Sequence, residues 1–589
     1  MSSSGSAFNW KLLKRVMVFV MPFKLFFILT IIITLALAAL APVMPWLTQI
    51  ALDDYIAKDE MQGLLRITLI MSAVLLTQGI LQYIYTTLTN RLGQEVIYSM
   101  RKTLFERIVR FSSSYFDKTP VGITITRLVS DMETIADIFS DGIILIISDL
   151  LQVVVIIVIM FYIDFKLACI SLVTLPVLMI ATRVFQKNIR VTFNDVRTQV
   201  ARLNEFIQEH LTAMRIVQIF NREEQEMHKF EKINASHRDA NIRSIWFYSL
   251  FFPVVEILSA TSIGLIVWYG GGSAIKGLAS FGILVAFIQY INQLFRPIRQ
   301  LADKFNTLQM GMVSSERIFK LYDETHSEVN EGKLVAENIK GKIEFRNVWF
   351  AYKENGWILR DLSFVIPAGQ SVAIVGHTGA GKTTIINLIN RLYEIQKGSI
   401  LIDDVDIREY DLQSLRKVIG IVLQDVFLFS DSIYQNVALY DSSITESEVQ
   451  LILEKTGAWE FISQLPEGLD YNPGERGGLL STGQRQLISF ARVLAHKPQL
   501  IILDEATSSV DSELEHLLVK ATEMVTQGRT SLIIAHRLST IKNASRIMVM
   551  ERGKIIEEGN HQTLLALKGV YSHLYNIQFR VMEAQDSGS

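Results

Sequence analysis

Six apolar segments in the first half of the chain are each long enough to cross the hydrocarbon core of a bilayer, which takes about 20 helical residues. Helices that are apolar all round are suited to a membrane and poorly suited to a soluble core. The sequence therefore predicts an N-terminal membrane domain of six α-helices over residues 1–322. The segments are 23–49, 64–88, 139–162, 166–186, 246–269 and 279–300.

Lysine and arginine are distributed unevenly around these segments. Ten lie within residues 187–243 and seven within 91–137, whereas the connections at 50–62, 163–166 and 270–278 hold one each. By the positive-inside rule, the two long connections and both termini face the cytoplasm. We expect a multi-pass protein of the cell (inner or plasma) membrane whose first helix is not cleaved, because no small-residue cleavage pattern follows a short apolar core.

The two long cytoplasmic connections have the pattern of helices rather than of disordered loops. The stretch "NEFIQEHLTAMRIVQIFNREEQEMHKFEKI" repeats apolar residues at helical spacing and places charges on the other face. We therefore predict long helical extensions into the cytoplasm, with short exposed turns around residues 119–125 and 210–215.

The composition changes after about Tyr322. Residues 323–340 are acidic, polar and without period, which predicts a linker. From residue 341 to 579, short β-branched runs alternate with helical stretches, and this pattern predicts an α/β nucleotide-binding domain. Residues 580–589 are expected to form a flexible tail. The predicted fold class is multi-domain, with a six-helix membrane domain and a C-terminal α/β phosphate-loop ATPase domain.

A phosphate-binding pattern opens this second domain. The stretch "GHTGAGKTT" at 376–384 fits G-x-x-x-x-G-K-[ST] and follows the apolar strand "SVAIV". Glycines allow backbone N–H groups to converge on the β-phosphate, a lysine reaches the β- and γ-phosphates, and a hydroxyl ligates Mg²⁺. A tight turn without a ligand is the poorer explanation, so ATP and Mg²⁺ are expected. The predicted ATP-binding residues are Gly376, His377, Thr378, Gly379, Ala380, Gly381, Lys382, Thr383 and Thr384, with Thr383 also a metal ligand.

Two carboxylates follow a second buried strand in "LIILDEATSSVD". Asp504 ends the strand, where it can reach the Mg²⁺ shell. Glu505 stands one residue further, where it can accept a proton from an attacking water. Such pairs also occur as caps, and only the phosphate loop upstream gives this pair a catalytic meaning.

Three more residues are candidates by position. His536 ends the strand "SLIIAHR" and could bond the γ-phosphate, although a histidine at a strand end is more often structural. Gln424 ends "IVLQD" and could complete the Mg²⁺ shell. Tyr352 could stack on adenine, although an isolated aromatic residue is usually part of a core.

Taken in order, "FAY", "GHTGAGKTT", "VLQD", "GERGGLLSTGQRQ", "LIILDEATSSVD" and "IIAHR" resemble the ATP-binding cassette, over about 240 residues. With six membrane helices ahead of it, the whole chain resembles a half-transporter of the ATP-binding-cassette exporter family (type IV fold). The resemblance implies that Tyr352 stacks on adenine, that Asp504 supports Mg²⁺ and that Gln424 is the lid glutamine, which also faces the membrane domain. It also implies that Glu505 is the catalytic base, that His536 is the switch, and that Ser509 and Asp511 lie in the loop joining two cassettes.

The stretch Ser481, Thr482, Gly483 and Gln484 matches the family signature that caps the γ-phosphate of ATP held by a second cassette. The resemblance therefore implies a dimer, because one chain carries one cassette. Thr482 replaces the first glycine of the usual "LSGGQ". The substitution is either tolerated or weakens this capping face, as in asymmetric heterodimers. It favours a heterodimer slightly, and a homodimer stays open.

Four polar residues within apolar segments mark a candidate substrate path: Asp149, Glu256, Gln289 and Asn292. Hydrogen bonds between helices are the alternative role for them. The expected substrate is a hydrophobic or amphipathic compound exported or flipped through the lipid bilayer. A homodimeric lipid or lipid A flippase, a heterodimeric multidrug exporter and an ATP-gated channel or regulator remain as alternatives.

Composition excludes further classes of protein. A formal net charge of −2 disfavours a nucleic-acid partner. The single cysteine, Cys169, cannot form an internal disulfide, and we expect it to be buried as a small hydrophobic residue.

Overall fold

The computed structural model describes residues 10–138, 143–276, 280–325, 328–353, 356–504, 512–534, 541–542 and 544–578. The chain divides into two compact units. The helical unit comprises Met1–Val109 and Thr119–Thr325, and the α/β unit comprises Arg110–Lys118 and His326–Ser589. Residues 328–340, part of the stretch 323–340 that the sequence predicts as a linker, thus belong to the α/β unit, together with the short stretch Arg110–Lys118.

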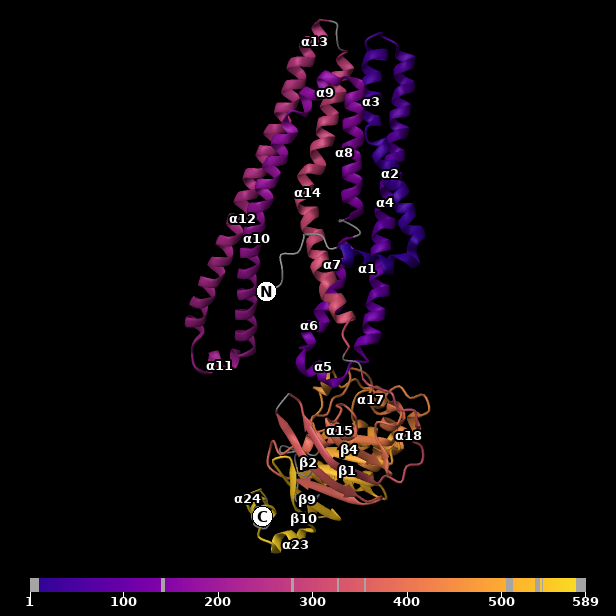
Figure 1. Cartoon of the computed structure of the whole chain (residues 1–589), viewed down its shortest axis with the longest axis vertical. Coiled ribbons are helices and arrows are strands. Elements are labelled where there is room, and N and C mark those ends of the chain that lie inside the picture. Colours follow the sequence, from indigo (N-terminus) through magenta and orange to yellow (C-terminus); the bar gives the residue numbers. More distant parts are fainter. Residues whose placement is uncertain are drawn as a thin grey trace. The chain divides into compact units, whose positions relative to one another are not determined.

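Long helices build the helical unit (Figure 1). Among the described residues, five stretches are long and apolar enough to cross a membrane: Trp10–Ile56, Met61–Ile108, Leu145–Ile163, Phe165–Thr212 and Glu223–Ile275. The sixth predicted segment, 279–300, lies in α14, which is not among those five. The elements are α1 (Trp10–Val20), η1 (Met21–Phe23), α2 (Lys24–Leu40), α3 (Val43–Ile50), η2 (Ala51–Ile56), α4 (Met61–Ile108), α6 (Val121–Thr126), η3 (Arg127–Asp131), α7 (Met132–Asp137), α8 (Ile143–Ile163), α9 (Phe165–Leu172), α10 (Thr174–Thr212), α11 (Met214–Ile219), α12 (Glu223–Leu265), η5 (Ile266–Gly270), α13 (Gly271–Ile275) and α14 (Phe281–Tyr322).

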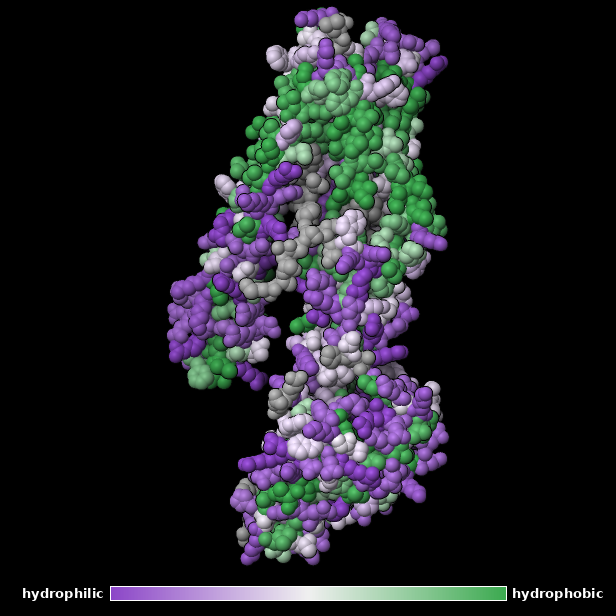
Figure 2. Space-filling view, in the orientation of Figure 1, coloured by the Kyte–Doolittle hydropathy of each residue, from purple (hydrophilic) through white to green (hydrophobic). Residues whose placement is uncertain are grey.

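Hydrophobic side chains cover the surface of one half of the helical unit (Figure 2). Leu76 is 70% exposed and Trp268 is 79% exposed in the isolated chain. Exposure of this extent over many apolar residues is stable only against lipid or another chain. Helices α10 and α12 lie side by side and are joined by α11 (Figure 1). Polar residues predominate on the lower parts of α10 and α12, whereas exposed apolar residues such as Ile219 and Phe220 gather at the tip around α11 (Figure 2).

Two contacts fix the ends of α14. At its start, Asp53 in the connection before α4 accepts hydrogen bonds from the Ser280 hydroxyl and from the Gly282 backbone N–H at 2.7 Å. At its end, both terminal nitrogens of Arg15 in α1 donate to the Asp323 carboxylate at 2.6 and 2.7 Å. Arg15 also lies 4.2 Å from the centre of the Phe319 ring. The N-terminal helix α1 is thereby tied to the last turn of α14.

The prediction that Cys169 is buried is wrong. Its side chain is exposed in the isolated chain. Helix α9 buries Leu167, Ala168 and Ser171 on its inner face, and Cys169 lies on the opposite face. A small apolar thiol is equally stable against lipid and in a protein core, so an apolar sequence context does not by itself place the residue inside the protein.

The α/β unit contains two sheets. One has the strand order β2-β1-β4-β5 and the other β10-β9-β3-β8-β7-β6. In the second sheet β9, β3, β8, β7 and β6 run parallel, so their carboxyl ends meet at one edge. The strands are β1 (Ile343–Ala351), β2 (Trp357–Ile366), β3 (Ser371–Val375), β4 (Lys397–Ile402), β5 (Val405–Asp406), β6 (Ile419–Val422), β7 (Leu500–Asp504), β8 (Thr530–Ile534), β9 (Arg546–Glu551) and β10 (Lys554–Gly559).

Helices cover both sheets and leave the strands β3, β7 and β8 almost completely buried. Such strands read as continuous apolar runs, which is why "SVAIV", "LIILD" and "TSLII" are recognisable in the sequence. The helices are α5 (Ser113–Lys118), α15 (Lys382–Ile389), α16 (Leu412–Val418), α17 (Ile433–Ala438), α18 (Glu446–Thr456), α19 (Trp459–Ile462), α20 (Thr482–Ala495), α21 (Ser512–Thr526), α23 (His561–Ala566) and α24 (Val570–Gln578).

Candidate functional site

The phosphate loop joins β3 to α15, at the carboxyl edge of the parallel sheet. Gly379 and Gly381 have φ angles of +83° and +105°, which side chains rarely allow. A Cβ on Gly376 would lie 2.2 Å from the backbone oxygen of Met550, and one on Gly381 would lie 2.9 Å from Leu359. Both glycines are therefore needed for the loop to pack, and the loop leads directly to the N-terminus of α15, where backbone N–H groups and the helix dipole favour an anion.

Lys382 is the first residue of α15 and is buried, with 8% exposure. Its ammonium donates to the backbone oxygens of Gly376 at 2.7 Å and His377 at 3.1 Å. Burial lowers the pKa of Lys382, and the nearby Asp504 carboxylate opposes this effect. A desolvated cation held against the loop is suited to an incoming phosphate, which would compensate its charge.

The predicted metal ligands meet where β7 ends. The Thr383 hydroxyl donates to Asp504 at 3.5 Å, and the side chain of Asp504 is buried. Gln424 follows β6, whose last residue Val422 pairs with Leu503 of β7, so it leaves the same edge of the sheet with an exposed side chain. A hydroxyl, a carboxylate and an amide oxygen are the hard ligands that Mg²⁺ prefers, so these residues fit the ion.

Tyr352 stands beside the phosphate loop and is 40% exposed. Its hydroxyl donates to Thr384 at 3.3 Å and accepts from the Asn387 amide at 3.2 Å. The Phe350 and Tyr393 rings contact it edge to face, with centroids at 4.8 and 5.0 Å. These contacts fix the orientation of the Tyr352 ring next to α15. Part of the ring surface stays exposed and can contact a ligand.

Replacing Tyr352 with alanine is expected to weaken ATP binding by about 5- to 150-fold, because stacking of a base on an aromatic ring contributes roughly 1–3 kcal/mol. Equilibrium binding of a fluorescent ATP analogue to the purified protein measures this. Tyr352→Phe keeps the ring and should bind within about twofold of the wild type, so an equal loss in both variants would show that the hydroxyl rather than the stacking surface matters.

Two residues near Tyr352 were missed by sequence analysis. The Tyr393 hydroxyl donates to the carboxylate of Asp117, which lies in α5, and burial together with Asp117 raises the pKa of Tyr393. A cavity of about 380 Å³ lies between α5 and the loop that carries Tyr352. Nothing in the spacing of Asp117 and Tyr393 predicts this contact, because 276 positions separate them.

The signature stretch opens α20 with a capping box. The Ser481 hydroxyl accepts from the Gln484 backbone N–H at 3.2 Å, and the Gln484 side chain accepts from the Ser481 N–H at 2.9 Å. Arg485 donates to the Thr482 hydroxyl at 3.2 Å. Ser481 and Thr482 are exposed, whereas Gly483 is buried. The helix N-terminus is therefore rigid and presents its first residues on the surface of the unit.

Thr482→Gly is expected to change the ATPase rate by no more than about tenfold, because the lost hydroxyl bonds Arg485 of the same helix and such a bond contributes about 0.5–1.5 kcal/mol. Steady-state ATPase of the purified assembly tests this. A large gain would instead show that the threonine weakens the capping face, which is the alternative left open above.

Four predicted residues, Glu505, Ser509, Asp511 and His536, lie outside the described residues. Of the candidate substrate path, Asp149 in α8 pairs with Lys304 in α14, and the two side chains are only 16% and 11% exposed. Glu256 is exposed on α12; on α14, Gln289 is half-buried and Asn292 is exposed.

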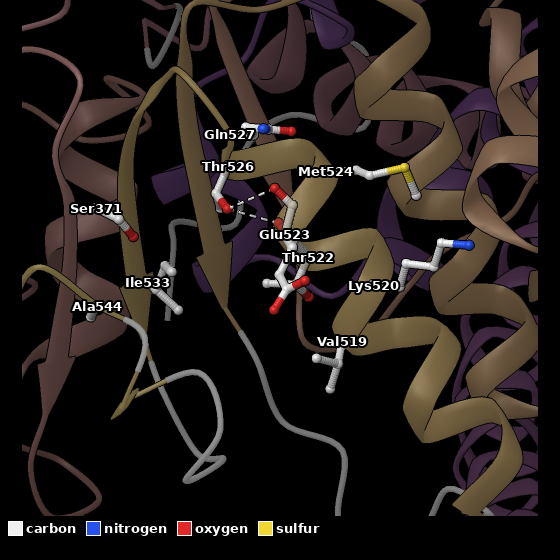
Figure 3. Close-up of a pocket in the computed structure, with 10 residues that line it drawn as sticks. All are labelled: Ser371, Val519, Lys520, Thr522, Glu523, Met524, Thr526, Gln527, Ile533 and Ala544. Atoms are coloured by element: carbon white, nitrogen blue, oxygen red, sulfur yellow. Dashed lines mark hydrogen bonds between the residues drawn. The ribbon is translucent and has the colours of Figure 1, made fainter.

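A separate cavity of about 410 Å³ lies between α21 and the strands β3 and β8 (Figure 3). Ser371, which contributes to its lining, begins β3, at the opposite end of that strand from the phosphate loop. On its other side the Thr526 hydroxyl donates to the backbone oxygens of Thr522 and Glu523 within α21. None of the predicted ATP-binding residues lines this cavity.

Two family models match the chain: ABC transporter transmembrane region, over residues 27–298, and ABC transporter, over residues 359–508. The chain is 37% identical to an uncharacterized ABC transporter ATP-binding protein, YknV, of Bacillus subtilis, over 97% of this chain and 95% of that protein. It is 36% identical to the probable multidrug resistance ABC transporter ATP-binding/permease protein YheH of the same organism, over 88% and 78%. It is also 36% identical to the ATP-dependent lipid A-core flippase of Desulfotalea psychrophila, over 97% and 100%.

A helical membrane domain joined in one chain to a phosphate-loop ATPase defines an ATP-driven membrane transporter. The chain belongs to the ABC transporter family, as a half-transporter of the type IV fold. The predicted fold class and the predicted family are confirmed. The protein is a multi-pass membrane protein that binds and hydrolyses ATP to drive export or flipping of its substrate.

Proposed function

We infer that two half-transporters sandwich ATP between them and use its hydrolysis to export or flip a hydrophobic or amphipathic compound. In each site Lys382 and the loop N–H groups would hold the β- and γ-phosphates, and Tyr352 would stack on adenine. Thr383, Asp504 and Gln424 would hold Mg²⁺, which supplies charge neutralisation at the phosphates. Glu505 would accept the proton of the attacking water, with His536 orienting both.

The main support for a dimer is the exposed N-terminus of α20, which holds the signature residues. Ser481 and Thr482 stand on the surface at the start of α20, where the dipole and free N–H groups favour a phosphate. The sequence holds one such signature and one phosphate loop, so a second chain would supply the cap for each ATP. Either a homodimer or a heterodimer meets this requirement, and Thr482 favours the heterodimer slightly.

The substrate class and the orientation rest on different observations. Relatives named as a multidrug transporter and as lipid A-core flippases support an amphipathic substrate. The lysine and arginine distribution supports cytoplasmic termini and a cytoplasmic α/β unit.

Purification without a co-expressed partner, followed by reconstitution into liposomes, tests this function. ATP-dependent movement of a fluorescent amphiphile between leaflets, together with a disulfide crosslink between Ser481→Cys and Gly379→Cys on different chains, is the expected result. Active transport by the single gene product would establish the homodimer. ATP-gated ion flux without movement of amphiphile, or full ATPase activity of a monomer, would overturn the proposal.

A further inference from the structure

A cleft of about 670 Å³ opens in the helical unit between α10, α12 and α14. This volume lies within the range of about 300–1,000 Å³ found for small-molecule sites. We refer to it as the basic cleft, because the described residues of its lining include five cations and one carboxylate. These residues are Arg183, Lys187, Arg190, Arg197, Arg317 and Asp131.

The cations of α10 form a single stripe. A helix advances by about 100° per residue, so Arg183, Lys187, Arg190 and Arg197 fall within an arc of about 80°. Cations required only by the positive-inside rule have no reason to share one face. Arg202, on the same helix, falls about 100° away from Arg183 and does not line the cleft.

Asp131, the one carboxylate among the described residues of the cleft lining, does not neutralise this stripe. Asp131 accepts from the Ser314 hydroxyl at 2.9 Å and lies 3.5 Å from Arg317 of α14. Arg197 donates to the sulfur of Met310. Among the described residues, no carboxylate pairs with Arg183, Lys187 or Arg190.

The same cleft has an apolar and aromatic side. Phe185, Phe193 and Tyr248 line it, and the Tyr248 ring contacts the two phenylalanine rings at centroid distances of 5.3 and 6.2 Å. Met310 and Val313 of α14 also line the cleft. A cationic stripe beside an apolar wall matches a molecule with an anionic end and an apolar end.

The cleft also lies where such a molecule would be found. The apolar part of α10 ends at about residue 186, so Arg183, Lys187 and Arg190 lie within about one helical turn of the point where the hydrocarbon core gives way to the head groups. Arginine and lysine at this depth can reach head-group oxygens while their aliphatic stems stay in the apolar layer.

We propose that the basic cleft is a binding site for the phosphate-bearing head group of an anionic amphiphile. Guanidinium groups bind phosphate oxygens in pairs, and three cations without a described carboxylate partner are available for them. The site rests on the proposed function, since it gives the transporter a preference for anionic over neutral amphiphiles. The shared chemistry is an anionic phosphate group, which a lipid head group or free inorganic phosphate could supply.

The test uses the full-length protein in phosphatidylcholine nanodiscs and three probes: dioctanoyl phosphatidic acid, dioctanoylglycerol and inorganic phosphate. The wild type is expected to bind the phosphatidic acid at least about tenfold more tightly than dioctanoylglycerol, because charge-assisted bonds form only with the former. The variant Arg183→Gln, Lys187→Gln, Arg190→Gln should lose this preference. Arg202→Gln should keep affinity within about twofold, because it removes one positive charge from the same helix outside the cleft.

Further variants and a competitor distinguish the proposed site from misfolding and from a site for free phosphate. Arg183→Lys with Arg190→Lys keeps the charges and should retain most of the affinity, which excludes misfolding of the glutamine variant as the cause. Displacement of phosphatidic acid by an equal concentration of inorganic phosphate would overturn the amphiphile proposal in favour of a free-phosphate site. Equal losses in the triple variant and in Arg202→Gln would also overturn it. ATP-driven flipping of a neutral fluorescent amphiphile, measured on the same samples, reports on the proposed function separately.

Discussion

Glu505→Gln is expected to lower steady-state ATP hydrolysis by about 10²- to 10⁴-fold, the contribution of a positioned general base. Glutamine keeps the shape of the side chain but cannot accept a proton from the attacking water. The residue follows Asp504, the buried end of β7, which lies 3.5 Å from the Thr383 hydroxyl of the phosphate loop. ATP binding should persist, because Lys382 and the loop N–H groups are unchanged.

Single-turnover hydrolysis and equilibrium ATP binding, measured on the same preparation, separate chemistry from binding. Glu460→Gln removes an exposed carboxylate from α19 of the same unit and should leave both quantities unchanged. Hydrolysis at the wild-type rate in Glu505→Gln would remove the role proposed for this residue. Loss of ATP binding would show that the substitution damages the site rather than the proton transfer.

Asp149→Leu is expected to destabilise the helical unit by about 3–5 kcal/mol, because it leaves the Lys304 ammonium without its partner in a largely buried position. The two side chains are 16% and 11% exposed and join α8 to α14. A fall in the thermal unfolding midpoint of the detergent-purified protein measures the effect. The double variant Asp149→Leu, Lys304→Leu should recover most of the loss, since replacing both charges with apolar groups avoids the uncompensated ion.

An exposed ion pair provides the control. Lys58 and Asp54 pair at 2.8 Å, with side chains that are 64% and 54% exposed. Asp54→Ala should change stability by less than about 1 kcal/mol, as exposed pairs do. If Asp149→Leu were as mild, or if the double variant were as unstable as the single one, the α8–α14 pair would not contribute as described.

Local patterns made much of the ATP site predictable. The loop at 376–384 could be found because a buried strand, glycines and a lysine follow one another directly in the chain, and the structure places them as β3, loop and α15. The capping box of Ser481 and Gln484 is likewise local. Each of these patterns spans only a few residues, so it can be recognised from the sequence without a structure.

Contacts between distant parts of the chain could not be predicted in this way. Asp149 was identified as an unusual charge in an apolar helix, but Lys304, 155 positions away, has no periodic relation to it. Three of the four cations of the stripe on α10, Lys187, Arg190 and Arg197, were used only as evidence of orientation, and Arg183 was not used. Their common cleft depends on where α12 and α14 pack, which the sequence alone does not show. The prediction for Cys169 was wrong because the sequence does not say which face of a membrane helix meets lipid.

The α/β unit begins, in chain order, with Arg110–Lys118, well before the rest of it is synthesised. During synthesis, this nine-residue stretch can pack into the α/β unit only after the later membrane helices and the strands it contacts have been made. A fragment that starts at residue 341 would lack Asp117, the acceptor for Tyr393, and would also lose Glu328, which pairs with Arg416 at 2.8 Å. An ATPase fragment of this kind would therefore lack part of the compact α/β unit. Nucleotide affinities measured on it would describe a site without the contact between Asp117 and Tyr393.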